Sequence, residues 1–184
     1  MSIKGLEQAI TNLNSISTTA VPRASAQAVN RVATRAVNKS VSVVSKDTRV
    51  PRKLVKQRAR VRRATVKKPR ALIRVNRGNL PAIKLGTASV RLSRRKRDRR
   101  GANSVLRIGP FRFPGAFIQQ LKNGRWHVMR RTAKPRYPIE VVSIPLAVPL
   151  TTAFRDELPK LMETDMSKEL RASLKNQLRL ILKR

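Results

Sequence analysis

The chain lacks cysteine, and that absence excludes several kinds of chemistry. None of its 184 residues is cysteine, so disulfide bonds, thiol catalysis and thiolate zinc sites are ruled out. Aromatic residues make up only 3% of the chain, so a core must consist mainly of Val, Ile, Leu and Ala. No stretch reaches the roughly 18 apolar residues that cross a bilayer, and the first ten residues do not have the pattern of a signal peptide. We expect a soluble protein that contacts no membrane and is cytoplasmic when it is made.

Acidic residues are scarce as well. Nine Asp and Glu stand against 43 Lys and Arg, so the formal net charge is +34. Residues 48–139 hold 29 of the basic residues and one acidic residue. Such a field attracts polyanions and binds nucleic acid at low salt without regard to sequence. The composition therefore indicates a polyanionic partner for the middle of the chain.

The groups that catalysis needs are few and dispersed. His127 is the only histidine, and beside Trp126 it fits a packing role better than that of a general base. Outside the C-terminal segment the acidic residues are Glu7, Asp47 and Asp98, too far apart in sequence for a metal cage or an acid–base pair. We expect helix-end and solvated roles for the C-terminal acids Glu157, Glu163, Asp165 and Glu169. No phosphate-binding glycine motif is present, so we expect no enzyme, no metal and no cofactor.

The N-terminal segment has helical periodicity. Apolar residues at steps of three and four from Ile3 to Ile16 predict one amphipathic helix. Thr18, Thr19 and Pro22 then predict a bend or an interruption, with Pro22 in the first turn of a second helix. That helix continues to about Val44, with small apolar residues on its buried side. Thr48 and Pro51 suggest the start of a third helix, short and basic, within residues 48–65.

From residue 71 the period changes to two. Residues 71–78, 82–93 and 104–109 nearly alternate apolar with polar or basic residues, as antiparallel strands with one solvated face do. The basic run "RLSRRKRDRR" (91–100) then lies at the tip of a hairpin. A second hairpin is expected within 109–131, turning at "KNG", with Phe117, Leu121, Trp126 and Val128 in the core. Residues 139–144 predict a further strand.

The C-terminal residues return to helical periodicity. A helix is expected from Leu150, a break near Thr164–Asp165, and a last helix with Asp165 as its N-cap. The fold class that follows is α+β, with N- and C-terminal helices packed on a curved antiparallel β-sheet that carries a long basic hairpin loop. We expect one domain over 1–184: a helical part at 1–65, a β part at 66–147 with the basic loop at 93–104, and helices at 148–184.

The candidate nucleic-acid-binding residues are the cations of two basic runs. Arginine outnumbers lysine at the hairpin tip, and the guanidinium group binds phosphate oxygens in bidentate fashion. Aromatic residues near these runs are too few for stacking on single strands, and no helix has a base-reading pattern. Contact with the backbone of duplex DNA is therefore favoured. The residues are Arg94, Arg95, Lys96, Arg97, Arg99 and Arg100 at the tip, and Arg52, Lys53, Lys56, Arg60 and Arg63 in the other run.

Several stretches together resemble a known family. The chain is similar, in collinear order over essentially its whole length, to the minor tail protein Z family of lambda-like long-tailed bacteriophages. The stretches that carry this resemblance are "MSIKGLEQAI", "VPRKLVKQRARVRRATVKKP", "RVNRGNLPAIKLG", "PGAFIQQLKNGRWHVMRR" and "IPLAVPLTTAF".

The resemblance implies a structural role in the virion. Proteins of this family complete the head-proximal end of the tail, contribute to head–tail joining and help to place the end of the packaged double-stranded DNA in the tail. The implied partners are other tail and neck proteins, namely the tail tube, the tail terminator and the tape measure, and further copies of the chain in a hexameric ring. Assembly in the host cytoplasm is implied. The family supplies no catalytic residues.

Two alternatives remain open from the sequence. The chain could be a free, non-specific nucleic-acid-binding protein, although its aliphatic terminal helices are more than such a protein needs. Its positive surface could also dock on an acidic tail protein and never touch DNA.

Overall fold

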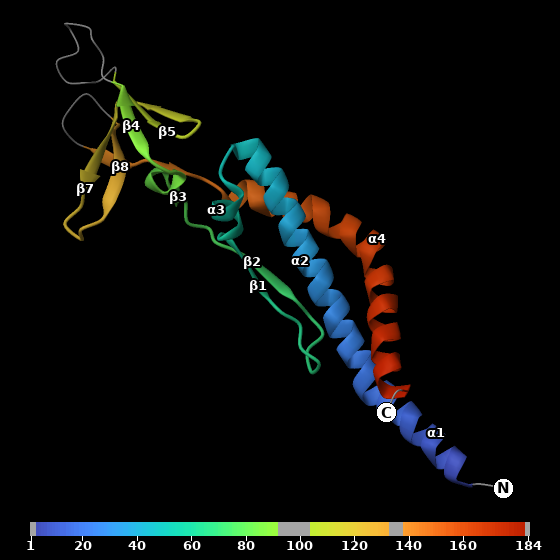
Figure 1. Cartoon of the computed structure of the whole chain (residues 1–184). Coiled ribbons are helices and arrows are strands. Elements are labelled where there is room, and N and C mark those ends of the chain that lie inside the picture. Colours follow the sequence, from blue (N-terminus) through green and yellow to red (C-terminus); the bar gives the residue numbers. More distant parts are fainter. Residues whose placement is uncertain (1–2, 92–103, 133–137, 183–184) are drawn as a thin grey trace, which may run out of the picture. The chain divides into compact units, whose positions relative to one another are not determined.

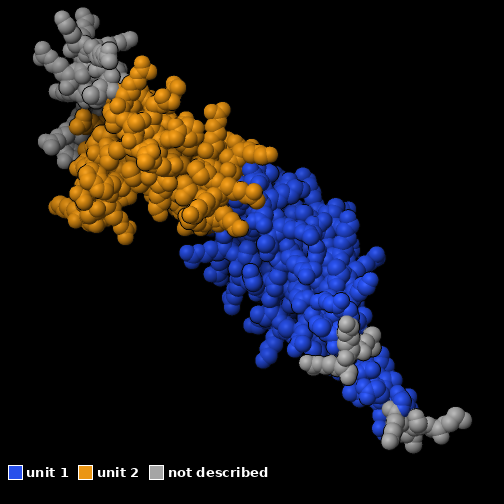
Figure 2. All heavy atoms as spheres, in the orientation of Figure 1, with its two compact units in different colours: residues 1–43, 59–75, 150–184 blue, residues 44–58, 76–149 orange. Residues whose placement is uncertain are grey.

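The described chain forms two compact units. The computed structural model describes residues 3–91, 104–132 and 138–182. Unit 1 consists of residues 1–43, 59–75 and 150–184, and unit 2 of residues 44–58 and 76–149 (Figure 2). The chain thus passes between the units four times. These boundaries do not coincide with the three consecutive parts expected from the sequence, and the expectation of one domain stays a prediction.

Unit 1 is built on two long helices. Helix α1 (Ile3–Ser15), the π-helical turn η1 (Ile16–Ala20) and helix α2 (Val21–Thr48) follow one another without a gap. The predicted interruption is therefore the wider π turn. Pro22 lies in the first turn of α2, but the helix continues through this position, so its missing N–H removes one bond from the helical ladder. Helix α4 (Ala147–Leu182) runs beside α2 (Figure 1).

The predicted break in the C-terminal helix is wrong. Helix α4 is continuous through Thr164 and Asp165; Pro149 lies in its first turn and Pro159 in its interior. Asp165 is a mid-helix residue whose carboxylate pairs with Arg35 of α2. Since a capping-type residue is recognised only by its local sequence, a partner from a distant segment could not be foreseen.

A two-stranded hairpin completes unit 1. Strands β1 (Ala59–Arg62) and β2 (Leu72–Val75) pair antiparallel, with Val61 opposite Ile73. Val32 and Ala36 of α2 and Leu161 of α4 form a buried cluster against which Ile73 packs. Small residues on α2 let the helices and the hairpin approach closely. The helical part expected over 1–65 is therefore wrong at its end, because residues 59–62 are a strand.

Unit 2 contains helix α3 and three small sheets. Helix α3 (Arg52–Lys56) is all that is helical in residues 49–65, so the predicted basic helix is much shorter than expected. The remaining elements are β3 (Leu80–Pro81), the 3₁₀ turn η2 (Ala82–Leu85), β4 (Ala88–Arg91), β5 (Val105–Ile108), β6 (Phe111–Pro114), β7 (Ala116–Gln120), β8 (Trp126–Arg131), β9 (Ile139–Val141) and β10 (Ser143–Ile144).

The sheets of unit 2 have the orders β4-β5-β6, β7-β8-β9 and β10-β3, and every pair is antiparallel. Backbone hydrogen bonds link elements beyond these ladders: the Val142 N–H donates to Val128 O over 2.8 Å, and the Ala82 N–H to Val142 O over 2.9 Å. The fully buried side chains include Leu80, Leu106, Ile108, Leu146 and Val128. Aliphatic residues therefore form this core, as the shortage of aromatics requires.

The α+β class is confirmed, but the single curved sheet is not. The described residues form four separate small sheets, since the β1–β2 hairpin belongs to unit 1 and the others to unit 2. The second predicted hairpin is confirmed as β7–β8, with Gly124 at φ 75° in its turn, a conformation that glycine adopts without strain. Residues 92–103 lie outside the described residues, so the basic hairpin loop between β4 and β5 stays a prediction.

The prediction that Trp126 is a core residue is wrong. Its side chain is 56% exposed, whereas Val128 on the same strand is 1% exposed. Trp126 and Val128 lie on the same face of β8, as period two requires. Trp126 is the first residue of the strand, beside the turn, and no second layer covers it there.

The contrast between buried and exposed positions in unit 2 can be tested by urea unfolding. Leu106→Ala removes a fully buried side chain and should lower the free energy of unfolding by about 2–5 kcal/mol. Trp126→Ala, which removes a larger but half-exposed side chain, should cost about 1 kcal/mol or less. A larger loss for Trp126→Ala than for Leu106→Ala would contradict this core.

Candidate nucleic-acid interface

The β1–β2 hairpin with its loop, residues 59–75, is here called the basic ribbon. Its seven cations are all exposed, and it contains no acidic residue. The alternation of the strands places Ala59 and Val61 on one side, and Arg60 and Arg62 on the other. The cations of the ribbon are Arg60, Arg62, Arg63, Lys67, Lys68, Arg70 and Arg74.

Two of these arginines lie directly opposite each other. In the register of the ribbon Arg60 is the partner of Arg74. Like charges in directly opposite positions destabilise an antiparallel pair. No ribbon cation forms an ion pair within the described chain, so nothing in unit 1 relieves this repulsion. An anion bound over the ribbon would do so.

The ribbon is fastened to helix α2 by a side-chain amide. The Asn30 side chain donates from Nδ2 to Ala64 O over 2.9 Å and accepts at Oδ1 from the Ala64 N–H over 2.8 Å. The carboxamide of Asn30 thus bonds to both the N–H and the C=O of Ala64, as the backbone of a neighbouring strand would. Beyond it, Thr65 and Lys68 exchange two backbone hydrogen bonds of 3.0 and 3.1 Å that close the loop. These bonds hold the cations on a defined surface.

Three acidic residues of helix α4 are paired with basic residues of α2. Arg31 Nη1 lies 3.0 Å from Glu169 Oε2, Arg35 Nη1 2.9 Å from Asp165 Oδ2, and Lys39 Nζ 2.7 Å from Glu157 Oε2. Arg35 also pairs with Glu169. The cations recur every fourth residue on one face of α2. Their residue numbers rise along α2 while those of their partners on α4 decrease, so the two helices are antiparallel.

These ion pairs correct the expectation of solvated roles for three of the four C-terminal acids; the fourth, Glu163, is exposed as expected. The side chains of Glu169, Glu157 and Asp165 are only 10%, 15% and 22% exposed. The hydrogen bond from Lys39 lowers the pKa of Glu157 despite partial burial, which opposes the shift. The hydrogen bond from Arg35 likewise lowers the pKa of Asp165. These carboxylates are therefore neutralised by cations of α2 within unit 1, and none of them pairs with a cation of the ribbon.

Unit 2 has exposed cations of its own. Lys53 and Lys56 are exposed on α3. On the β4-β5-β6 sheet, Arg107 lies directly opposite Arg112, and both are exposed. Arg107 lies on β5, the strand that follows the basic loop expected at 93–104, and Arg112 lies on the next strand, β6.

The predicted binding residues thus fall into three groups. Arg60 and Arg63 lie on the basic ribbon of unit 1, and Arg52, Lys53 and Lys56 lie on α3 of unit 2. The tip residues Arg94, Arg95, Lys96, Arg97, Arg99 and Arg100 lie outside the described residues.

The sequence reasoning missed several basic residues. Arg62 and Arg74 share the outer face of the ribbon with Arg60, and the alternation in "ARVR" and "LIRV" was the signal that could have found them. Arg107 and Arg112 carry no such signal, because their opposition arises only from strand register. Asn30 carries no such signal either, because its role as the anchor of the ribbon depends on tertiary contact.

The chemistry that the described residues support is contact with phosphate groups. Exposed guanidinium groups at cross-strand spacing can donate to adjacent phosphate oxygens in bidentate geometry. In the described part of the chain, no three His, Asp or Glu side chains gather into a group that could hold a metal ion. No helix among those residues is long and apolar enough to cross a membrane.

Fold and surface together define a class: an α+β protein whose exposed β faces carry opposed arginines, while three of its acidic residues pair with cations inside a helical unit. Residues 3–184 match the family described as prophage minor tail protein Z (GPZ). The chain belongs to this family, so the resemblance seen in the sequence is confirmed.

Two relatives match over the full length of both chains. The tail completion protein of Escherichia phage N15 is 89% identical over 184 residues, and tail completion protein Z of Escherichia phage lambda is 58% identical over 192 residues. The comparison with solved structures gives no match. These relatives do not support the alternative of a free nucleic-acid-binding protein.

The ion pairs between α2 and α4 predict a pH-dependent stability. Because pairing holds the pKa of Asp165 below its ordinary value of 3.8, its contribution is complete above that value and is lost as the pH falls through the lower folded pKa. Asp165→Asn should therefore lower the melting temperature at pH 7, and its difference from the natural chain should shrink below pH 3.8.

The matched control is Asp156→Asn, the same change at an exposed aspartate of the same helix. It should leave the melting temperature nearly unchanged at both pH values. Equal effects of the two substitutions at pH 7 would contradict a stabilising role for the Arg35–Asp165 pair.

Proposed function

We propose that the chain is a structural tail completion protein that acts at the head-proximal end of a phage tail. It completes the tail, takes part in joining the tail to the head and helps to place the end of the packaged double-stranded DNA. The support is membership of the minor tail protein Z family together with two full-length relatives named as tail completion proteins. Its role is structural, not catalytic.

The observation that carries the DNA contact is the unpaired arginine face of the basic ribbon. Duplex DNA presents one negative charge per about 1.7 Å of its axis, so any sequence supplies phosphates to Arg60, Arg62 and Arg74. The α2–α4 ion pairs hold acidic side chains away from this face. The hairpin tip at 94–100 is a second contact in this proposal. Charge neutralisation is sufficient, because DNA of every sequence must be accepted.

The partners in this proposal are the proteins at the same end of the tail: the tail tube, the tail terminator and the tape measure, with neck proteins on the head side. Copies of the chain form a ring, taken as hexameric because phage tail rings are sixfold. The chain assembles with these partners in the host cytoplasm and remains in the virion.

Salt dependence of DNA binding tests the ribbon. Each neutralised phosphate contributes about 0.9 to the slope of log K against log salt, so replacing Arg60, Arg62 and Arg74 by Ser should flatten the slope by about 2.7. The measurement is a fluorescence titration of short duplex DNA at several salt concentrations.

A control variant removes the same charge from another face. Replacing the exposed Arg171, Lys175 and Arg179 of α4 by Ser should change the slope less than the ribbon variant does. A third variant replaces the six tip cations by Ser and should flatten the slope markedly while the thermal transition is kept. Equal changes for the ribbon and α4 variants would mean diffuse attraction and would contradict a defined ribbon contact.

Charge should also govern assembly of the purified chain. Copies that each carry +34 repel one another, and salt screens this repulsion over a Debye length of about 10 Å at 0.1 M. We expect monomers or small oligomers at about 50 mM salt and larger assemblies at about 500 mM salt or with duplex DNA. Sedimentation velocity distinguishes these states. A stable hexamer at low salt without any partner would show that the positive charge lies away from the subunit contacts.

A further inference from the structure

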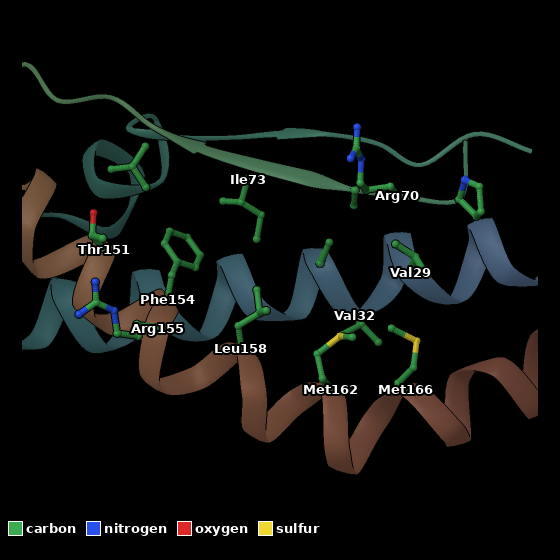
Figure 3. Close-up of a pocket in the computed structure, with 14 residues that line it drawn as sticks. Val29, Val32, Arg70, Ile73, Thr151, Phe154, Arg155, Leu158, Met162 and Met166 are labelled. Carbon is green, nitrogen blue, oxygen red and sulfur yellow. The ribbon is translucent and has the colours of Figure 1, made fainter. Parts of the chain in front are cut away.

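Unit 1 contains an open apolar groove that none of its own segments fills. The groove has a volume of about 630 Å³, within the range of about 300–1,000 Å³ typical of binding pockets. It lies between the ribbon and the two long helices, where Ile73 faces Leu158, Met162 and Met166 of α4 (Figure 3). Its charged lining residues, Arg70 and Arg155, are both exposed. A segment that fits this groove should therefore be apolar, and an acidic group at its edge could pair with Arg70 or Arg155.

Helix α1 has the opposite arrangement from a normal surface helix. Leu6, Ile10 and Leu13 recur at the spacing of one helical face, yet they are 65%, 50% and 64% exposed. The face about 200° away, which begins two residues later, is polar. Its residues Gln8, Asn12 and Ser15 line a hollow together with Gln177, Leu180 and Ile181 from the end of α4.

On this polar side Asn12 and Ser15 are half-buried and Gln8 is exposed, so α1 meets the end of α4 only through its polar side, near its C-terminal half, and its apolar side is turned toward solvent. Amphipathic helices bury their apolar face in a folded assembly, so this face lacks its partner in the isolated chain.

Charge makes α1 a suitable occupant of the groove. Helix α1 carries one basic residue, Lys4 at its start, and one acidic residue, Glu7, and residues 5–22 contain no Lys or Arg. In a chain of net charge +34, such a segment can approach Arg70 and Arg155 without repulsion. Glu7 follows Leu6 at the edge of the apolar face, where its carboxylate can pair with either arginine. Helix-in-groove binding of this kind uses apolar anchors at i, i+4 and i+7, the spacing of Leu6, Ile10 and Leu13.

The groove of the same chain is out of reach. The chain is helical without a gap from Ile3 to Thr48, so Leu6 lies 23 residues before the groove residue Val29. At a rise of 1.5 Å per residue this separation is about 35 Å along the helix, and a continuous helix cannot fold back on itself. The occupant must belong to another molecule.

From these observations we infer that helix α1 of one copy docks in the apolar groove of the next copy. Leu6, Ile10 and Leu13 enter between the ribbon and α4, and Glu7 meets Arg70 or Arg155. Because donor and acceptor surfaces differ, the contact is head-to-tail, and repetition of such a contact closes a ring or extends a filament. This inference rests on the proposed function for the existence of a ring, and it names the surfaces that join the subunits.

Cysteine cross-linking in assembled tails tests this contact. The natural chain has no cysteine, so introduced pairs react without background. Met162→Cys in the groove is combined in turn with Leu6→Cys, Ile10→Cys or Leu13→Cys, and tails purified from infected cells are treated with a short thiol cross-linker. At least one pair should give a ladder of multimers, since each copy links to a copy on both sides.

The matched control combines Met162→Cys with Gln8→Cys on the polar face of α1, and the ladder should be lost. A product that stops at the dimer would reveal a two-fold contact and overturn head-to-tail docking. Cross-links to a different tail protein, or no cross-link with any of the three pairs, would also overturn the proposal.

Substitution gives a second test that does not depend on cross-linking geometry. Ile10→Asp and Met162→Asp change exposed side chains, so circular dichroism should show an intact fold. In purified protein at high salt, each variant alone should lose the assemblies of the natural chain. A mixture of the two retains one intact donor and one intact groove and should form a discrete heterodimer; failure of the mixture to pair where the natural chain assembles would contradict docking.

Failure of this inference can be told from failure of the proposed function. Immunoblotting of finished tails reports whether the chain is present, and joining to heads reports whether it is required. Tails that need and contain the chain but give no cross-link would overturn only the docking of α1. Tails that join heads without the chain would overturn the proposed function itself.

Discussion

The ion pairs between α2 and α4 are the constraint on which unit 1 depends. Arg31, Arg35 and Lys39 hold the carboxylates of Glu169, Asp165 and Glu157 in an antiparallel register. That register brings together the helical surfaces that, with Ile73 of the ribbon, enclose the buried cluster. It also places acidic side chains of a strongly basic chain where they stabilise the fold. The basic ribbon is left without acidic partners.

This arrangement leaves two exposed surfaces without a partner, one like-charged and one apolar, and each is suited to a different kind of partner. The ribbon presents opposed arginines, whose repulsion an anionic polymer relieves. Helix α1 and the apolar groove present uncharged aliphatic surface, which only another folded segment covers well. A protein that joins copies through apolar surface and meets DNA through charged surface can use both in one ring, because the DNA contact proposed for Arg60, Arg62 and Arg74 does not use the residues that line the groove.

Much of the fold follows from local sequence. Period-three-and-four spacing predicted α1 and α2, and period-two spacing predicted β4, β5 and the β7–β8 hairpin. The errors occur where a distant residue decides the outcome. Asp165 looks like an N-cap but pairs with Arg35, and residues 59–62 look like the end of a basic helix but are a strand that pairs with residues 72–75. Trp126 looks like core on its hydrophobicity alone, yet no layer covers it.

The sequence by itself determined the charge, the absence of thiol chemistry and the α+β class, because these depend on composition and on short-range periodicity. It also determined the family, because long stretches resemble that family in collinear order. Only the tertiary structure decided which cations are free and which are paired. Arg35 and Arg60 are both arginines, and composition does not tell them apart. The packing of α2 on α4 places Arg35 beside Asp165, whereas the pairing of β1 with β2 places Arg60 beside Arg74. The same is true of α1, whose apolar stripe reads as a core-facing helix. Its exposure follows from the polar face being turned toward the end of α4, a contact between segments more than 150 residues apart in the chain.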